Sequence, residues 1–460
     1  MSGAVKIVSY ISGLFLLLVS VCAYWNMSFY YYLLDELTML SEFYDLGWSS
    51  IFKAQNEHFA PFFKILLYGY PKIFGNAVLP WRNFSVFVHF LATLAGFFLS
   101  LKLSKSVSLS LLFSLFFAFC PLIWETMYMQ SGLGTTSSVL SWLLTLLLFL
   151  KADDSKRFGT LLAAYLMLVL QSYTFGNNLF YPLVIFALYF FKNSPFRKSN
   201  LIFAVLIQAL NLYVFFNKGS FQNNQNFLGG TVLTYDLVLR MMTYFAVSFY
   251  ANFGRALIAY EPSISSSLIN YQVLIPFLLA LFPSLFVAYK NKDSRPIILT
   301  GWVNYGLVIG LISVSRYRLP YEQCLSSRYI YLIMPALLCV LVPTLTYLLQ
   351  GYSKVTYLLI LGLVFRYDTT YSGLQHERFK AETLHARNYQ LLVYAKDHPE
   401  VQITDFLTTA YLPTERVTGL LRQYESEKIL DLDHRVPNNI KAKPKELEIR
   451  LLRPEAITKP

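Results

Sequence analysis

The sequence predicts an all-α polytopic membrane protein with about eleven transmembrane helices and a large first external loop. Hydrophobic residues make up 55% of the 460 residues and charged residues only 14%, well below the charge of a soluble domain. The apolar residues fall in repeated runs, close to the roughly 20 residues with which a helix crosses about 30 Å of hydrocarbon. Helices satisfy their own backbone hydrogen bonds, so they are the expected spanning elements.

Eleven apolar segments are candidate spans. They cover residues 7–25, 84–101, 106–124, 132–150, 158–171, 179–191, 201–216, 272–289, 297–315, 329–349 and 355–365. The first segment continues through Tyr24 and Trp25, which are typical of an interfacial aromatic belt. We therefore interpret it as a retained helix, with cleavage as a signal peptide after Ala23 as the alternative.

Residues 158–191 contain no charge, yet basic clusters flank both ends of this segment. A single crossing would leave these clusters on opposite sides of the membrane, so the positive-inside rule favours a hairpin of two short helices that turns at residues 171–178. Basic residues of alternate connections then share one side: Lys6, Lys102, Lys105, residues 151–157 and 192–198, Lys290, Lys292, Arg295 and Lys354. By the same rule, that side is cytoplasmic.

The opposite, external side receives residues 26–83, 125–131, 217–271 and 316–328. We assign residues 1–365 to a transmembrane domain, with residues 26–83 as its first external loop, and residues 366–460 to a small C-terminal extracytoplasmic region. The C-terminal region would be cytoplasmic if residues 355–365 do not span. The net charge of +12 follows from this topology, and no basic stripe with interleaved aromatics indicates nucleic-acid binding.

The first external loop holds the ionisable residues that most need an explanation. Its apolar residues recur at spacings of three and four, which predicts two amphipathic helices in the membrane plane: Leu33, Leu37, Leu40 and Tyr44, then Phe62, Ile65, Leu66 and Tyr70. Asp35 and Glu36 are adjacent, so only one of them can face a cavity between the spans. Ionisable groups at a membrane boundary are costly unless they function, although both acids could also be solvated residues at a helix start.

Two motifs resemble a known superfamily. One is the Asp35-Glu36 pair in a first external loop with interfacial helices, and the other is Ser326-Ser327-Arg328-Tyr329, which leads into a late helix that contains Pro335. Together with the topology of residues 1–365, they are similar to the GT-C superfamily of polyprenyl-phosphate-sugar-dependent membrane glycosyltransferases. That superfamily includes the protein O-mannosyltransferases and the lipid A aminoarabinose transferase.

The resemblance implies that a lipid-phosphate sugar enters from the membrane and that an acceptor hydroxyl displaces the lipid phosphate with inversion. The acceptor would be a cell-surface glycan, lipid or protein. Such a reaction needs one general base and positive charge around the departing phosphate. Asp35 matches the superfamily's catalytic position and is the expected base, with Glu36 in reserve. Arg328 matches its arginine motif, and we add Arg316 and Arg318 because their guanidinium groups suit bidentate phosphate contact.

Other polar residues on the external side are candidates for positioning the acceptor or the sugar. They are Asn56, Glu57, His58 and Glu125, with Gln171, Asn177 and Asn178 at the predicted hairpin turn. His58 could instead cap the second interfacial helix, and the turn amides could instead satisfy the backbone of the turn. We expect no cofactor, with a divalent metal held by Asp35, Glu57 and His58 as the alternative. The resemblance implies a bacterial inner membrane, with the active site on the extracytoplasmic side.

Two other classes of function remain open. A transporter or lipid flippase would place ionisable groups in mid-bilayer and show repeated halves, whereas these spans carry almost no charge and show no repeat. A membrane O-acyltransferase would use a histidine within a span, and His89 is the candidate. A lone histidine there is more often packed or hydrogen-bonded than catalytic.

Overall fold

The computed structural model describes most of the membrane domain as helices that pack side by side. It describes residues 46–53, 60–74, 78–120, 132–174, 176–218, 234–258, 270–316 and 327–349, with isolated positions before residue 46 and at residues 122 and 126. The predicted span 355–365 and the C-terminal region lie outside these residues, and the predicted span 7–25 is described only at isolated positions.

Helices occupy the other nine predicted spans. Their bounds are α4 (Val78–Ser104), α5 (Val107–Phe119), α7 (Gly132–Ser155), α8 (Phe158–Ser172), α9 (Tyr181–Phe191), α10 (Arg197–Lys218), α12 (Tyr271–Lys290), α13 (Arg295–Arg316) and α14 (Ser327–Leu348). Within the described residues, five helices are long and apolar enough to cross a membrane: those at Asn83–Ser104, Gly132–Ser155, Tyr271–Lys290, Arg295–Val314 and Tyr329–Leu348. These helices indicate a membrane protein.

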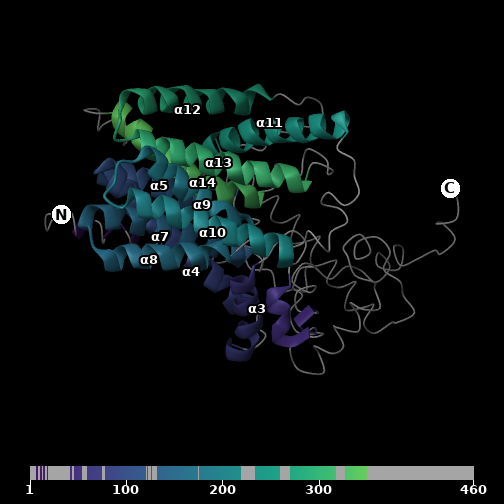
Figure 1. Cartoon of the computed structure of the whole chain (residues 1–460). Helices are drawn as coiled ribbons and strands as arrows, with labels where there is room; N and C mark the ends of the chain where they lie inside the picture. Colours follow the sequence, from purple (N-terminus) through teal and green to yellow (C-terminus); the bar gives the residue numbers. More distant parts are fainter. Residues whose placement is uncertain are drawn as a thin grey trace, which may run out of the picture.

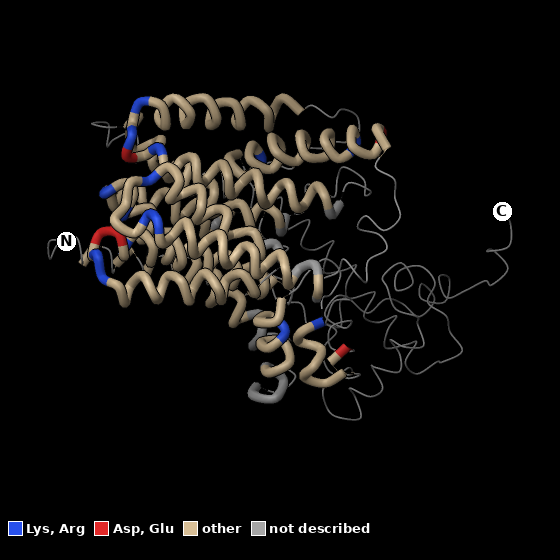
Figure 2. Tube along the Cα trace, in the orientation of Figure 1, with Lys and Arg blue, Asp and Glu red and all other residues tan. Residues whose placement is uncertain are grey.

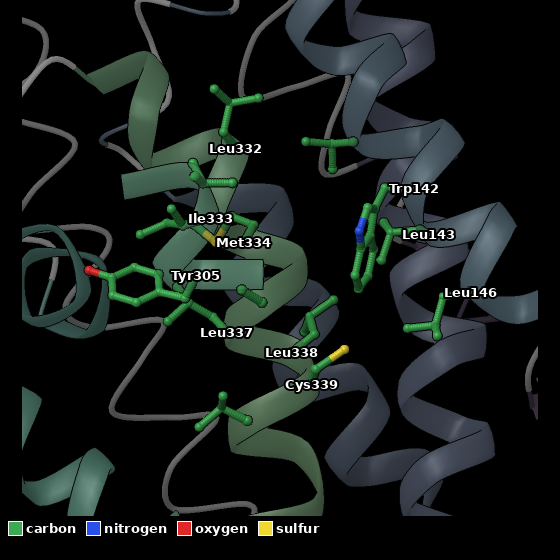
Figure 3. Close-up of a cluster of buried hydrophobic side chains, with 14 of the residues drawn as sticks. Trp142, Leu143, Leu146, Tyr305, Leu332, Ile333, Met334, Leu337, Leu338 and Cys339 are labelled. Carbon is green, nitrogen blue, oxygen red and sulfur yellow. The ribbon is translucent and has the colours of Figure 1, made fainter. Parts of the chain in front are cut away.

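Helix α14 lies at the centre of the bundle and is buried along almost its whole length. Figure 3 shows its apolar side chains between Trp142 and Leu146 of α7 on one side and Tyr305 of α13 on the other. At Gly301, α13 approaches α14 so closely that an added Cβ would lie 2.8 Å from Val340 Cγ2. Close approach at a small residue is a common way for membrane helices to pack, because it increases van der Waals contact between them.

The described basic residues in the connections between spans gather at one end of the bundle, which we call the basic end (Figure 2). They are Lys102, Lys105, Lys151, Lys156, Arg157, Lys192, Arg197, Lys198, Lys290, Lys292 and Arg295. Three carboxylates lie among them: Asp293, Asp153, which forms an ion pair with Lys192, and Asp154, which forms one with Lys102. The predicted common side for these clusters is confirmed for the described residues, and we call the opposite end of the bundle the outer end.

The predicted hairpin is also confirmed. Helices α8 and α9 are separated by a turn and a short 3₁₀ helix, η3 (Gly176–Phe180), at the outer end. At the basic end, Arg197 begins the next helix and donates hydrogen bonds to the carbonyls of Tyr189 (3.1 Å) and Phe190 (3.0 Å) in the last turn of α9. Arginine at that position therefore both marks the side of the membrane and caps a helix C-terminus.

Helix α5 is shorter than predicted, because it ends at Phe119 and not near residue 124. Cys120 has a ψ of 110° and precedes Pro121. The proline ring disfavours the helical conformation for the residue before it, so the chain leaves the helix there. The start is fixed by Ser106, whose side chain accepts a hydrogen bond from the Leu109 amide.

One prediction was wrong: residues 217–271 are not simply an external loop. They contain a 24-residue helix, α11 (Tyr235–Ile258), which lies beside α12 and α13 and extends past their outer ends (Figure 1). Its inner half is packed into the bundle, since an added Cβ at Gly254 would lie 1.9 Å from the carbonyl oxygen of Val273 in α12.

Hydropathy does not reveal α11, because charged and polar residues interrupt its apolar sequence. The charged residues are Asp236, Arg240 and Arg255. Helix α10 ends and α12 begins at the outer end, so the connection between these two spans still starts and finishes on the predicted side.

The second amphipathic helix of the first loop is present as α3 (Pro61–Phe74), outside the bundle and across the direction of its helices (Figure 1). Phe63, Lys64, Leu67 and Tyr68 form its buried side. Phe62, Ile65 and Leu66 form an exposed apolar side, as expected for a helix at a membrane interface. The first predicted amphipathic helix lies outside the described residues, apart from isolated positions.

Candidate functional site

Most of the predicted site residues lie outside the part of the chain that the structure describes. These are Asp35, Glu36, Asn56, Glu57, His58, Glu125 and Arg318. The base, the positioning residues and the metal alternative therefore stay predictions. Arg316 and Arg328 are described as backbone positions within helices.

Arg316 and Arg328 are brought to the same end of the bundle. Arg316 is the last residue of α13 and Arg328 is the second residue of α14, and these two helices pack against each other. Helix α13 begins at the basic end and ends with Arg316, and α14 begins after the connection that follows, so both arginine positions lie at the outer end. The structure thus places these two predicted phosphate-binding positions on the predicted side of the bundle.

Buried polar side chains gather near the outer end around the α8–α9 turn. We call Ser138, Gln171, Ser172, Asn178 and Asn211 the outer polar cluster, and all five residues are buried. The Ser138 hydroxyl donates to Asn178 Oδ1 (2.7 Å), and Asn178 Nδ2 donates to the carbonyl of Gln171 (3.0 Å). Asn211 Nδ2 donates to Ser172 Oγ (3.1 Å) and to the carbonyl of Leu179 (2.8 Å).

These hydrogen bonds decide the role of Asn178, which sequence analysis left open. Both polar atoms of its amide are engaged with the protein, so it stabilises the turn. Gln171 differs: within the described residues, neither polar atom of its fully buried amide has a hydrogen-bond partner. A buried amide without a partner is costly, so Gln171 is the better candidate of the two to bind a polar ligand.

The first external loop meets the bundle next to this cluster. The backbone amide of Phe62, in the first turn of α3, donates a hydrogen bond to the carbonyl of Tyr173 (3.3 Å), two residues after Gln171. The described chain resumes at Ala60, which follows the predicted Asn56-Glu57-His58 motif by two residues.

Lys64 holds α3 to the segment before it. Its ammonium group is buried and donates to Glu42 Oε2 (3.2 Å) and to the carbonyls of Ser50 (3.1 Å) and Lys53 (2.8 Å). These three acceptors match the three N–H donors of a lysine. Burial lowers the pKa of Lys64, and the Glu42 carboxylate opposes that shift. Lys64 therefore has a structural role, because it joins α3 to the segment that contains Glu42, Ser50 and Lys53.

Arg255 is a second buried charge, and sequence analysis did not single it out. Its side chain is 1% exposed, near the inner end of α11. The sequence does show an isolated arginine in an apolar stretch of a predicted external connection. Its burial could not be predicted, because we did not expect this stretch to pack into the bundle.

His89, the candidate residue of the acyltransferase alternative, is fully buried between α4, α5 and α14. One ring nitrogen, Nε2, lies 3.3 Å from the carbonyl oxygen of Ala118, and the other, Nδ1, lies 2.9 Å from the Tyr331 hydroxyl. Since a carbonyl only accepts, Nε2 carries the proton and Nδ1 accepts from Tyr331. The ring also packs edge-on against Phe117. This geometry is that of a structural histidine with both nitrogens satisfied.

We expect substitutions at this pair to lower stability without a specific loss of catalysis. Tyr331→Phe removes one buried hydrogen bond and should cost about 1 kcal/mol, whereas His89→Ala also leaves a cavity and should cost about 3 kcal/mol. Denaturant unfolding in detergent measures both changes. If Tyr331→Phe abolished turnover at unchanged stability, His89 would be part of the chemistry.

Comparison with known proteins finds no matching family model, no matching curated protein and no matching solved structure.

Proposed function

We propose that this protein is a membrane glycosyltransferase that moves a sugar from a polyprenyl-phosphate donor to a hydroxyl group. The acceptor belongs to a cell-surface glycan, lipid or protein, and transfer takes place at the extracytoplasmic face of a bacterial inner membrane. Asp35 takes the proton of the hydroxyl as its oxygen attacks the anomeric carbon. The bond from that carbon to the phosphate oxygen breaks, and the lipid phosphate leaves with the electron pair, so the anomeric configuration is inverted.

The leaving phosphate needs compensating charge more than it needs a proton, because phosphate is a good leaving group once its charge is stabilised. In the proposal Arg328 provides this charge, with Arg316 and Arg318 beside it. Guanidinium groups form paired hydrogen bonds with phosphate oxygens, which fixes the orientation of the donor as well as its charge. Asn56, Glu57, His58 and Glu125 then position the acceptor or the sugar.

The observation that carries this proposal is the gathering of four features at one end of the bundle. The helix ends that bear Arg316 and Arg328, the helix α3 and the outer polar cluster all lie away from the basic end. The buried amide of Gln171, next to a membrane-facing helix, suits a substrate with sugar hydroxyls at one end and a lipid at the other. The proposed reaction itself comes from the resemblance of the Asp35-Glu36 and Arg328-Tyr329 motifs to those of the GT-C superfamily.

The proposal is tested by asking which donor the purified, reconstituted protein consumes. We expect turnover of a radiolabelled polyprenyl-phosphate sugar, with release of polyprenyl phosphate that depends on an added acceptor. Radiolabelled acyl-CoA serves as the control donor. Consumption of acyl-CoA with no use of any lipid-phosphate sugar would contradict glycosyl transfer and favour the acyltransferase alternative.

A further inference from the structure

The connection between α12 and α13 forms a charged turn at the basic end of the bundle (Figure 2). Its charged residues are Lys290, Lys292, Asp293 and Arg295. Three positive charges and one negative charge leave a net charge of +2. The backbone amides of Asp293 and Ser294 donate hydrogen bonds to Asn291 Oδ1 (3.0 and 3.2 Å). The backbone that carries these charges therefore has a defined turn conformation.

Arg295 and Lys290 are both held beside Tyr289 in the last turn of α12. Arg295 Nε donates to the carbonyl of Ala288 (2.8 Å), and its Nη2 donates to the carbonyl of Tyr289 (3.0 Å). A guanidinium has five N–H donors, so these two bonds leave three of them for a ligand. Lys290 Nζ lies 5.5 Å from the centre of the Tyr289 ring. Two cations therefore lie at the same corner of the bundle.

The connection between α9 and α10 is built in a similar way, but one of its charges is neutralised within the protein. Lys192 at the end of α9 forms an ion pair with Asp153 of α7, and Ser194 donates a hydrogen bond to the same carboxylate. Among the residues that the structure describes, no carboxylate lies within ion-pair distance of the three basic side chains of the α12–α13 connection. This connection therefore keeps its positive charge available for an anion.

Helix α12 has an apolar stripe that leads away from this corner. Its members recur at spacings of four and three residues, and each is at least half exposed: Ile275, Leu279, Phe282, Phe286 and Tyr289. This spacing places them on one face of the helix. Because α12 is long and apolar enough to cross a membrane, we expect this face to lie against acyl chains. An apolar stripe with cations at one end matches a lipid with a negatively charged headgroup.

We propose that Lys290, Lys292 and Arg295 bind the headgroup of an anionic phospholipid whose acyl chains lie along the apolar stripe of α12. The lipid phosphate accepts hydrogen bonds from the remaining N–H donors of Arg295, and the two lysines add positive charge around it. The headgroup lies on the surface of the protein and the chains lie on an exposed helix face. The site is at the opposite end of the bundle from the outer polar cluster, and it does not depend on the proposed sugar transfer.

The experiment uses the full-length protein in detergent and measures lipid binding by native mass spectrometry. The probe is phosphatidylglycerol, and phosphatidylcholine with the same acyl chains is the uncharged control. The test variant combines Lys290→Gln with Lys292→Gln, which removes two exposed charges from the proposed site. The matched control combines Lys151→Gln with Lys156→Gln, which removes two exposed charges near the α7–α8 connection, across the bundle from α12 (Figure 1). Since all four lysines are exposed, we expect both variants to fold as the wild type does.

We expect the wild type to bind phosphatidylglycerol about tenfold or more tightly than phosphatidylcholine. The test variant should weaken phosphatidylglycerol binding by about tenfold or more, because it loses two charges at the headgroup, and should leave phosphatidylcholine binding unchanged. The control variant should bind both lipids as the wild type does. Phosphatidylglycerol with short acyl chains should bind weakly to all three proteins, because it lacks most of the contact with the apolar stripe.

An equal loss of phosphatidylglycerol affinity in the test and control variants would overturn the proposal, because it would indicate attraction to the basic end as a whole. Wild-type affinity in the test variant would also overturn it, and so would equal binding of both lipids by the wild type. If the short-chain lipid bound as tightly as the long-chain lipid, the role of the apolar stripe would be refuted. None of these measurements involves sugar transfer, so the site can fail while the proposed function holds, and the reverse.

Discussion

Asp35→Asn is expected to abolish sugar transfer while the protein still inserts and accumulates at the wild-type level. Asparagine keeps the shape of aspartate but cannot take a proton at neutral pH, so the acceptor hydroxyl loses its general base. General bases contribute about a hundredfold or more to the rate, which sets the size of the expected loss in kcat. Transfer of a radiolabelled sugar, with membrane levels measured on the same samples, checks the prediction.

Glu36→Gln is the matched control for this experiment, since it removes the neighbouring carboxylate. We expect a much smaller effect from it, because adjacent residues do not share a helix face and only one of the two can approach the substrate. Unchanged turnover in Asp35→Asn with a strong loss in Glu36→Gln would transfer the role of the base to Glu36. Unchanged turnover in both variants would refute the assignment of this pair.

Arg328→Ala is expected to raise the donor KM by about tenfold or more, because it removes a paired, charged contact to the lipid phosphate. If the guanidinium contact strengthens as the phosphate leaves, kcat falls as well, since such a contact contributes to the transition state. Donor titration at saturating acceptor separates the two effects. The KM for the acceptor should stay close to its wild-type value.

Arg328→Lys distinguishes charge from geometry at the same position. Lysine keeps the positive charge but lacks the planar fork, so we expect a donor KM between those of the wild type and Arg328→Ala. A titration in which Arg328→Ala has the same donor KM and kcat as the wild type would remove Arg328 from the phosphate site.

The features of the fold that depend on charge and apolar length were predictable from the sequence. The hairpin of α8 and α9 followed from two basic clusters that flank an uncharged segment, and both clusters do lie at the basic end. Nine predicted spans coincide with helices among the described residues. The early end of α5 could also have been predicted, since Pro121 restricts the residue before it.

The features that depend on long-range contacts were not predictable. Tyr331 satisfies His89 from 242 residues away, so no local pattern could show that this histidine is structural. Helix α11 was missed because its three charges lower the local hydropathy, while its burial comes from packing against α12 and α13. The burial of Arg255 in this helix follows from the same packing, and the sequence analysis did not single this residue out. At the candidate site, the charge pattern predicted the end of the bundle at which Arg328 lies, and its role in binding phosphate stays a prediction. The burial of Gln171, whose amide has no hydrogen-bond partner within the described residues, depends on packing that no local pattern shows.

The shortness of α8 and α9 has a consequence for the bilayer itself. At 1.5 Å per residue, these helices are about 22 Å and 17 Å long, against about 36 Å for their neighbour α7. Lipid tails around the hairpin must compress to match this length, at a modest cost for each ångström of mismatch. The membrane beside Gln171 should therefore be thinner than elsewhere, and a bulky polar headgroup travels a shorter distance there to reach the protein interior.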